Sequence, residues 1–377
     1  MTATFTDYAA RLRRLLDSRS ASPPGGIERD ITESRFNELA IELFALQFSH
    51  NRLYRKLCEA RGVSPAQVST WQQLPAVPAS AFKELELTSL PEADRIAIFH
   101  SSGTTEQQPS RHFHSAQSLD LYEASVVSSF QTHLWPEARE KLELVFLAPS
   151  LSLAPHSSLV HMLETIRRRL GAPGSQFTGA LDGDGRWNLD LPKTISTLEN
   201  AIAAHRPIAL LGTAFNFVHL LDRLAELRRR LPLPEATRLM ETGGYKGRSR
   251  SLPKAELHQK ITERFGIPPT HVVSEYGMTE LSSQAYDWKV PAPGAQIEAT
   301  ERIFQFPPWA RVQIISPETG APVSEGATGL LRVCDLANLH SVLAVQTEDL
   351  AVRRGAGFEV VGRAATVEPR GCSLMTT

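Results

Sequence analysis

A repeated alternation of short apolar runs with amphipathic stretches constrains the fold of this chain more than any other feature of its sequence. The apolar runs have the length of buried strands, and a glycine or proline follows several of them. They lie at residues 142–147, 207–213, 238–240 and 271–273, and the helical patterns between them cover 157–170, a stretch through Phe217, Leu220 and Leu224, and 254–265. This strand–helix alternation predicts a layered α/β fold with a parallel sheet.

The N-terminal part carries mostly helical patterns. Residues 32–34 read Thr-Glu-Ser and predict the start of a helix, while Ser115 or Ser118 opens another helix over 115–135. The stretch from Trp71 to Pro78 is interrupted by prolines and predicts a loop.

The pattern changes from Arg311 onward, where short strands alternate with turns. Strands are predicted at 312–315, 329–333, 341–345 and 358–361. We therefore expect an α/β core with a helical N-terminal segment over residues 1–310, and a small β-rich C-terminal lobe with a short tail over 311–377.

Length and charge narrow the class of protein. A chain of 377 residues with 42% hydrophobic content is expected to form one large domain with sub-lobes, or two domains. A formal net charge of -1, with dispersed Lys and Arg, argues against a nucleic-acid partner. Three cysteines without paired spacing argue against a disulfide scaffold and a structural zinc site. Without a leader, or an apolar stretch near about 18 residues, we expect a soluble cytoplasmic protein with no membrane span.

A loop of small hydroxyl residues follows the apolar run 96–99. It reads Ser101, Ser102, Gly103, Thr104 and Thr105. Glycine allows close backbone approach, and consecutive N–H groups together with hydroxyls can surround a phosphate. The loop lacks the Gly-Lys-Ser/Thr of a P-loop, which disfavours a Walker-type NTPase. Taken alone, it fits a polar surface turn equally well.

A second segment, residues 274–280, follows the predicted strand 271–273. Ligands of α/β proteins bind at the carboxyl ends of strands. Tyr276 offers a flat face for a purine, Thr279 a hydroxyl for phosphate, and Glu280 an oxygen ligand for Mg²⁺.

Two further segments fit a nucleotide. Gly243 and Gly244 follow a predicted strand and would let a purine lie against the main chain. Asp349, in Thr347-Glu348-Asp349, could accept hydrogen bonds from both ribose hydroxyls. Each segment by itself is also typical of an ordinary turn.

In this order the four segments resemble the adenylate-forming superfamily, which includes acyl-CoA synthetases, luciferases and nonribosomal adenylation domains. The resemblance implies layered parallel sheets covered by helices, with ATP and Mg²⁺ bound at the motifs. It places the 101–105 loop on pyrophosphate, Thr279 near the α-phosphate, Glu280 on the metal and Asp349 on ribose. The remaining nucleotide-binding residues that it implies are Gly243, Gly244, Glu275, Tyr276, Gly277 and Arg363.

A closer resemblance covers essentially the whole chain. The segments 213–219, 241–247, 308–311 and 370–374 are similar to the acyl-protein synthetase (LuxE-type) family. That resemblance implies ATP-dependent formation of an acyl-adenylate from a carboxylic acid, with a fatty acid as the expected substrate. The acyl group then moves to a cysteine near the C-terminus, which here is Cys372.

The chain departs from the larger superfamily members in its charges. Those members carry a C-terminal lid with a catalytic lysine, but no lysine follows Lys289, so we expect the full lid domain to be absent. Glu106 stands where many relatives have glycine, and Glu348 replaces the glycine of Thr-Gly-Asp. Candidates for the missing positive charge are Arg111, Arg311, Arg363 and Arg370.

The transfer step needs a nucleophile, and a thiolate attacks activated acyl groups readily. Arg370 stands two residues before Cys372 and would lower its pKa. Cys58 and Cys334 lie in an apparent helix and at a strand end, and we expect them to be structural. His156, ahead of a helix, is a candidate to bind the substrate carboxylate, although a loop histidine is more often simply exposed.

Three functions remain open. The first is an acyl-protein synthetase that works with an acyl-reductase, acyl-transferase or carrier-protein partner. The second is an adenylating ligase that passes an acyl or aryl group to the pantetheine of a carrier protein or to CoA. The third is a binding module with degraded chemistry, which the missing lysine and Glu106 favour slightly.

Overall fold

The computed structural model describes residues 4–20, 31–101, 108–136, 141–183, 187–243, 252–292 and 301–364. The α-helices in these segments are α1 (Phe5–Ser20), α2 (Glu33–His50), α3 (Arg52–Ala60), α4 (Ala81–Glu84), α5 (Ala116–Leu134), α6 (Ser158–Leu170), α7 (Leu191–Ala203), α8 (Ala214–Glu226) and α9 (Lys254–Phe265). In the same segments, no helix is long and apolar enough to cross a membrane.

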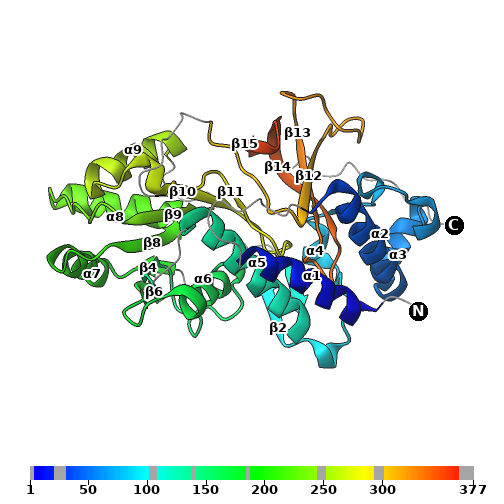
Figure 1. Ribbon diagram of the computed structural model, residues 1–377, viewed down its shortest axis with the longest axis horizontal. Helices are drawn as coiled ribbons and strands as arrows, with labels where there is room; N and C mark the ends of the chain where they lie inside the picture. Colours follow the sequence, from blue (N-terminus) through cyan, green and yellow to red (C-terminus); the bar gives the residue numbers. More distant parts are fainter. Residues whose placement is uncertain are drawn as a thin grey trace.

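The strands of the first half are β1 (Val77–Pro78), β2 (Ala97–His100), β3 (Arg111–His114), β4 (Glu143–Leu147), β5 (Gln176–Phe177), β6 (Gly179–Leu181), β7 (Trp187–Leu189) and β8 (Ile208–Thr213). The strands of the second half are β9 (Arg238–Thr242), β10 (Val272–Tyr276), β11 (Ala285–Tyr286), β12 (Ala310–Ile315), β13 (Thr328–Asp335), β14 (Ala344–Arg354) and β15 (Gly357–Arg363). Figure 1 shows the central strands with α7, α8 and α9 at one end of the molecule, and the helices α1 to α3 at the other.

The central sheet has the strand order β11-β10-β9-β8-β4-β5 within the described chain. All neighbouring pairs are parallel except β10 with β11. Side chains alternate between its two faces. Leu144, Phe146, Leu211, Met240 and Val273 pack on the side of α5 and α6. Val145, Leu147, Leu210, Leu239 and Val272 pack on the side of α7, α8 and α9. Both faces are therefore buried, and polar groups gather at the carboxyl edge.

Local sequence signals explain the helices beside this sheet. Ser115 caps α5, which settles the choice between Ser115 and Ser118, and Ser157 caps α6 through Val160 N. Helix α9 begins and ends as the sequence predicts, with Gly266 in a left-handed conformation after its last residue. The predicted parallel α/β core is thus confirmed.

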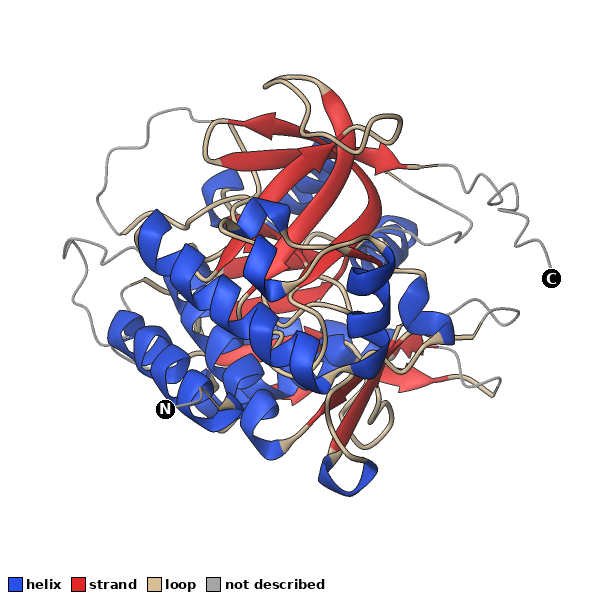
Figure 2. Cartoon of the chain, turned by 90° about the vertical axis from the view of Figure 1, so that its right-hand side faces the viewer, coloured by secondary structure: helices blue, strands red, loops and turns tan. Residues whose placement is uncertain are grey.

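A second sheet has the order β1-β14-β13-β12, and β15 also pairs with β14. It shares one hydrophobic cluster with the N-terminal helices, in which Tyr8, Phe44, Trp309 and Val345 are buried together. Figure 2, viewed from the side of α2 and α3, shows helices and this sheet side by side. The boundary at residue 310 stays a prediction, since the segments on its two sides pack into a common core.

Three local predictions were wrong or incomplete. The stretch from Trp71 to Pro78 contains β1, which joins the second sheet through Val345. The strand predicted at 341–345 begins at Ala344 and continues to Arg354, so Thr347–Asp349 lies inside a strand. The strand before the hydroxyl loop is present, but it pairs with β3 in a separate two-stranded sheet.

Candidate active site

Thr279 lies where the turn after β10 meets the start of α6. Its hydroxyl is 3.2 Å from the hydroxyl of Ser158. His112 donates from Nδ1 to the Thr279 carbonyl over 2.9 Å. Burial lowers the pKa of His112 to about 4, so the ring is neutral at physiological pH. Two side chains from separate elements therefore hold Thr279 in place beside a helix N-terminus.

Residues at the end of β13 and just after it hold the residues around Glu280 by hydrogen bonds. Asn338 donates to the Glu280 carbonyl over 3.0 Å. Asp335, at the end of β13, accepts from the Ser282 N–H over 2.9 Å and from the Ser283 hydroxyl over 2.8 Å. These contacts clamp the turn of residues 277–284 between the two sheets, with Glu280 6% exposed.

Tyr276 and Asp349 meet across the two sheets. The Tyr276 hydroxyl donates to Asp349 Oδ2 over 2.7 Å. Burial raises the pKa of Tyr276, and the nearby carboxylates of Asp349 and Glu280 add to the effect. Arg363 Nε lies 3.9 Å from Asp349 Oδ1. The structure thus brings together four residues that the sequence assigns to the nucleotide and its metal.

Glu275 faces the other way. It has the same orientation as Val273 on β10, so its side chain lies on the α5 and α6 side of the sheet. The Thr242 hydroxyl donates to Glu275 Oε2. A Cβ at Gly277 would meet Glu275 Oε1, so a larger residue there would require the Glu275 side chain to shift. The Glu275 carboxyl therefore points away from Asp349. Only the backbone of Glu275 is in a position to take the predicted role beside adenine.

The start of the hydroxyl loop lies next to His156. The His100 N–H donates to the His156 carbonyl over 2.7 Å. The two imidazoles stack with centroids 4.9 Å apart, and His156 Nδ1 donates to the Ile98 carbonyl over 3.2 Å. Ser101 Oγ accepts from the Ser110 N–H over 2.9 Å, which closes the base of the loop. The start of the loop, at the end of β2, therefore lies next to the N-terminus of α6.

Gly243 has a φ of +68°, a conformation that favours glycine, at the end of β9. The other predicted site residues lie outside the described residues; they are Ser102, Gly103, Thr104, Thr105, Gly244 and Cys372. Their assignments stay predictions.

The two described cysteines are buried and free. Burial raises the pKa of Cys58 to about 11 and also raises that of Cys334. Neither thiol can ionise readily, in agreement with the structural roles predicted for both.

The sequence reasoning missed several residues that position the site. His112, Ser158, Asp335 and Asn338 hold residues 279–283 through the contacts above. His112 follows the hydroxyl loop in Arg-His-Phe-His, and its alternation with Phe113 was a usable strand signal. Nothing local marks Asp335 or Asn338, because their partners lie about fifty residues away along the chain.

Arg311, a candidate for the missing positive charge, has a structural role. Its guanidinium lies over the Phe36 ring, with 4.5 Å between Cζ and the ring centroid. It also donates to the carbonyls of Pro308 and Ile31. Arg111 and Arg363 remain as described candidates near the site.

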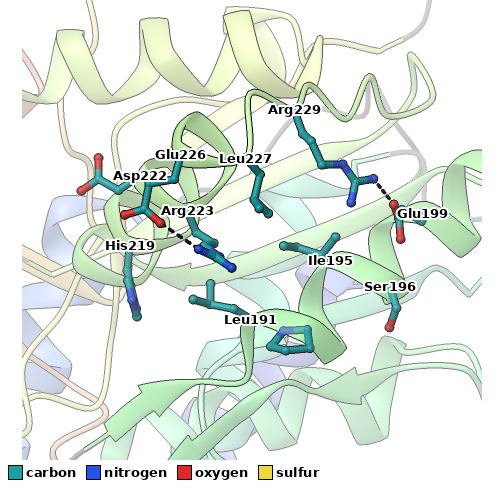
Figure 3. Close-up of a pocket in the computed structure, with 11 residues that line it drawn as sticks. Leu191, Ile195, Ser196, Glu199, His219, Asp222, Arg223, Glu226, Leu227 and Arg229 are labelled. Atoms are coloured by element: carbon teal, nitrogen blue, oxygen red, sulfur yellow. Dashed lines mark hydrogen bonds and ion pairs between the residues drawn. The ribbon is translucent and has the colours of Figure 1, made fainter.

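A groove of about 580 Å³ lies elsewhere, between α7 and α8 (Figure 3). Its lining contains the ion pairs Arg229–Glu199 and Arg223–Glu226. The described residues that line it include none of those assigned to the nucleotide. It is therefore separate from the candidate active site.

Glu280 stays the predicted ligand for Mg²⁺. Across the described segments, no three His, Cys, Asp or Glu side chains are arranged to hold a metal ion. Mg²⁺ commonly uses one or two protein carboxylates and takes its other ligands from phosphate and water, so the predicted role needs no such cluster.

The fold is that of adenylate-forming ligases. A structure of 2-hydroxyisobutyryl-CoA ligase in the postadenylation state with 2-HIB-AMP superposes with a TM-score of 0.67 at 14% identity, over 92% of this chain and 72% of that one. An open conformation of that ligase with 2-HIB-AMP and CoA gives a TM-score of 0.66 at 15% identity, over 92% of this chain and 80% of that one. At such identities the likeness establishes the fold.

The family described as "Acyl-protein synthetase, LuxE" matches residues 17–377. The long-chain-fatty-acid–luciferin-component ligase of Aliivibrio fischeri is 23% identical over 350 residues, or 90% of this chain and 86% of the relative. The corresponding ligase of Vibrio harveyi is 23% identical over 342 residues, or 88% and 84%. The chain belongs to the acyl-protein synthetase (LuxE) family. It is a ligase that activates a carboxylic acid and transfers its acyl group to a thiol, as the motifs predicted.

The buried carboxyl of Glu275 leads to a prediction about stability. Burial raises its pKa to about 7, above the roughly 4.3 of an unfolded chain. The protonated carboxyl therefore favours the folded state below about pH 4, and this contribution is lost as pH rises through 7. Glu275→Gln cannot ionise and keeps an acceptor for Thr242. Its free energy of unfolding should match the wild type near pH 4 and exceed it at pH 8, by on the order of 3 kcal/mol. Denaturant titrations at both pH values measure this gap, and a gap that does not grow with pH would contradict the burial argument.

Proposed function

We propose that this protein uses ATP and Mg²⁺ to convert a long-chain carboxylic acid into an acyl-adenylate and pyrophosphate, and then passes the acyl group to the Cys372 thiol. A partner protein would receive it afterwards. The named relatives act on long-chain fatty acids and a luciferin component, which supports a long chain here and a protein partner of the acyl-reductase, acyl-transferase or carrier-protein kind. A cytoplasmic location stays a prediction from the sequence.

One observation carries the proposal. Tyr276 and Asp349 are hydrogen bonded at one end of the turn after β10, and Thr279 is held by Ser158 and His112 at the other. The turn therefore spans the distance between a ribose acceptor and a hydroxyl at a helix N-terminus, where backbone N–H groups attract anions. This is the arrangement that a nucleotide with its phosphates needs.

In the first step, a carboxylate oxygen of the acid attacks the α-phosphorus, and the bond from that phosphorus to the pyrophosphate oxygen breaks. The protein contributes position and charge neutralisation. Asp349 would orient ribose, and the Thr279 hydroxyl would donate to the α-phosphate. The 101–105 loop would hold pyrophosphate, with His156 and Arg111 beside it. Mg²⁺ held by Glu280 would neutralise the negative charge that develops on the phosphate oxygens.

In the second step, the Cys372 thiolate attacks the acyl carbon and AMP leaves with the bonding electron pair. The thioester keeps much of the activation of the mixed anhydride, so the acyl group remains transferable to another nucleophile. Arg370 would stabilise the thiolate before attack.

Carboxylate-dependent exchange of labelled pyrophosphate into ATP tests the first step. A panel of straight-chain, branched and aryl acids should include at least one that raises exchange well above the rate without acid, and long-chain acids should be the best. Intact-protein mass spectrometry in the same mixtures should detect one added acyl group. If no acid in the panel supports exchange, the proposal fails and a binding module becomes the better account.

A further inference from the structure

A group of buried polar side chains lies on the face of the central sheet that Asp349 does not touch. Glu275 on β10 stands directly opposite Tyr286 on β11, and Thr242 ends the neighbouring strand β9. Directly opposed residues in an antiparallel pair have their side chains on the same face. Gln284 precedes β11 and is 4% exposed.

Two atoms of this group have no partner among the described residues. The Tyr286 hydroxyl and Gln284 Oε1 are buried and make no hydrogen bond with any described residue. The third member, Glu275, accepts a hydrogen bond from the Thr242 hydroxyl through Oε2. Native proteins pair the great majority of buried polar atoms. Unpaired atoms that gather in one place therefore indicate a missing partner.

The side chains of this group lie close to one another. The position of a Cβ at Gly277 would be in contact with Glu275 Oε1 and 3.5 Å from Gln284 Cγ, so both side chains border the same point. Glu275 also raises the pKa of the Tyr286 hydroxyl, after the larger effect of burial, which places the two groups within electrostatic reach.

This group also lies close to Thr279, which the proposed function places at the α-phosphate. Tyr122 on α5 donates to the Ser158 carbonyl over 3.1 Å, and it also lies within electrostatic reach of Glu275. Ser158 in turn holds the Thr279 hydroxyl. Thr279 is four positions after Glu275, which limits the distance between their Cα atoms to roughly 13 Å.

We propose that Glu275, Gln284 and Tyr286 form a polar recognition site for a hydrogen-bond donor on the acid, so that the preferred substrate carries a hydroxyl or amino group on its acyl chain. This inference rests on the proposed function and adds a substrate class to it. The unpaired amide oxygen of Gln284 is an acceptor, and the Tyr286 hydroxyl can accept or donate. A plain hydrocarbon chain would leave the Gln284 oxygen and the Tyr286 hydroxyl unpaired in a buried site, which is unfavourable. A substrate O–H or N–H would pair them, and sites built this way discriminate strongly against analogues that lack the group.

The test compares matched acids in pyrophosphate exchange with the full-length enzyme. Each plain acid of given chain length is paired with its hydroxy and amino derivatives, substituted at several positions along the chain. At least one substituted acid should have a kcat/KM about tenfold or more above its plain parent, and the identity of the better derivative separates a hydroxyl from an ammonium ligand. Equal or lower values for all substituted acids, with plain acids active, would overturn this inference and leave the proposed function standing. No exchange with any acid would overturn both.

Two variants link the preference to these side chains. Tyr286→Phe removes only the unpaired hydroxyl and should reduce the ratio of substituted to plain acid at least severalfold. Tyr8→Phe is the matched control, because the Tyr8 hydroxyl is also buried but donates to the Leu336 carbonyl within the second sheet's core. The control should keep the wild-type ratio. An unchanged ratio in Tyr286→Phe would overturn the proposed site, and since the ratio compares two substrates on one enzyme, partial loss of folded protein does not affect it.

Discussion

The Cys372→Ser variant should lose all covalent acyl label while it keeps carboxylate-dependent pyrophosphate exchange close to the wild-type rate. The exchange reaction uses only the acid, ATP and the residues at the sheet edge, whereas label on the protein needs a nucleophile that ends as a thioester. A serine hydroxyl at neutral pH is a far weaker nucleophile than a thiolate. Incubation with labelled acid and ATP, followed by denaturing electrophoresis and exchange on the same sample, measures both steps.

Cys58→Ala is the control for this experiment. Cys58 is fully buried in the N-terminal core, and burial raises its pKa to about 11. Its loss should leave the label in place, with at most a modest decrease in stability. Label that survives in Cys372→Ser would show that another residue accepts the acyl group.

Glu280→Gln should decrease the exchange rate about a hundredfold or more, which corresponds to about 3 kcal/mol of transition-state stabilisation. The substitution keeps the shape of the side chain but removes the negative charge that would hold Mg²⁺ against the phosphates. Initial rates at saturating ATP and acid, over a range of Mg²⁺ concentrations, measure the effect, and added Mg²⁺ should restore part of it.

Glu143→Gln is a matched control, because Glu143 lies at the amino end of a central-sheet strand, whereas the candidate site lies at the carboxyl ends of these strands. Glu143 begins β4, is largely buried, and pairs with Arg206 over 2.8 Å. Its substitution should lower thermal stability without changing the exchange rate per folded molecule. If the Glu280→Gln enzyme keeps more than half of the wild-type exchange rate, Glu280 does not take part in the reaction as proposed.

Local signals in the sequence were sufficient for the elements that border the site. Helix α9 follows from an amphipathic pattern that Gly266 ends, and α6 from the Ser157 cap and Gly171. These features depend on residues a few positions apart, so a single sequence contains the needed information.

Features that depend on contacts between residues far apart in the chain could not be predicted from local sequence signals. Thr347–Asp349 resembled a turn, but β13 and β15 hold it within the long strand β14. Asn338 and Asp335 fix the turn after β10 across the interface between the two sheets. Their identities give no hint of those contacts, because asparagine and aspartate are equally common in exposed turns.

The face of the sheet on which the Glu275 side chain lies could have been predicted from the sequence, but it was not. Val273 is apolar and buried against α5 and α6, and period-two alternation along a strand then fixes Glu275 on the same face. The sequence therefore held enough information to separate Glu275 from Tyr276, although the resemblance to adenylate-forming enzymes grouped both with adenine. Side-chain alternation is a useful check on any role carried over from a motif.

A crystal structure with a nonhydrolysable acyl-adenylate analogue tests the central claim most directly. The account predicts ribose hydroxyls within hydrogen-bond distance of Asp349, the phosphate mimic beside Thr279, and the acyl chain on the α5 and α6 side of the sheet next to Glu275. An analogue bound in the groove between α7 and α8, or anywhere remote from Tyr276 and Thr279, would contradict it.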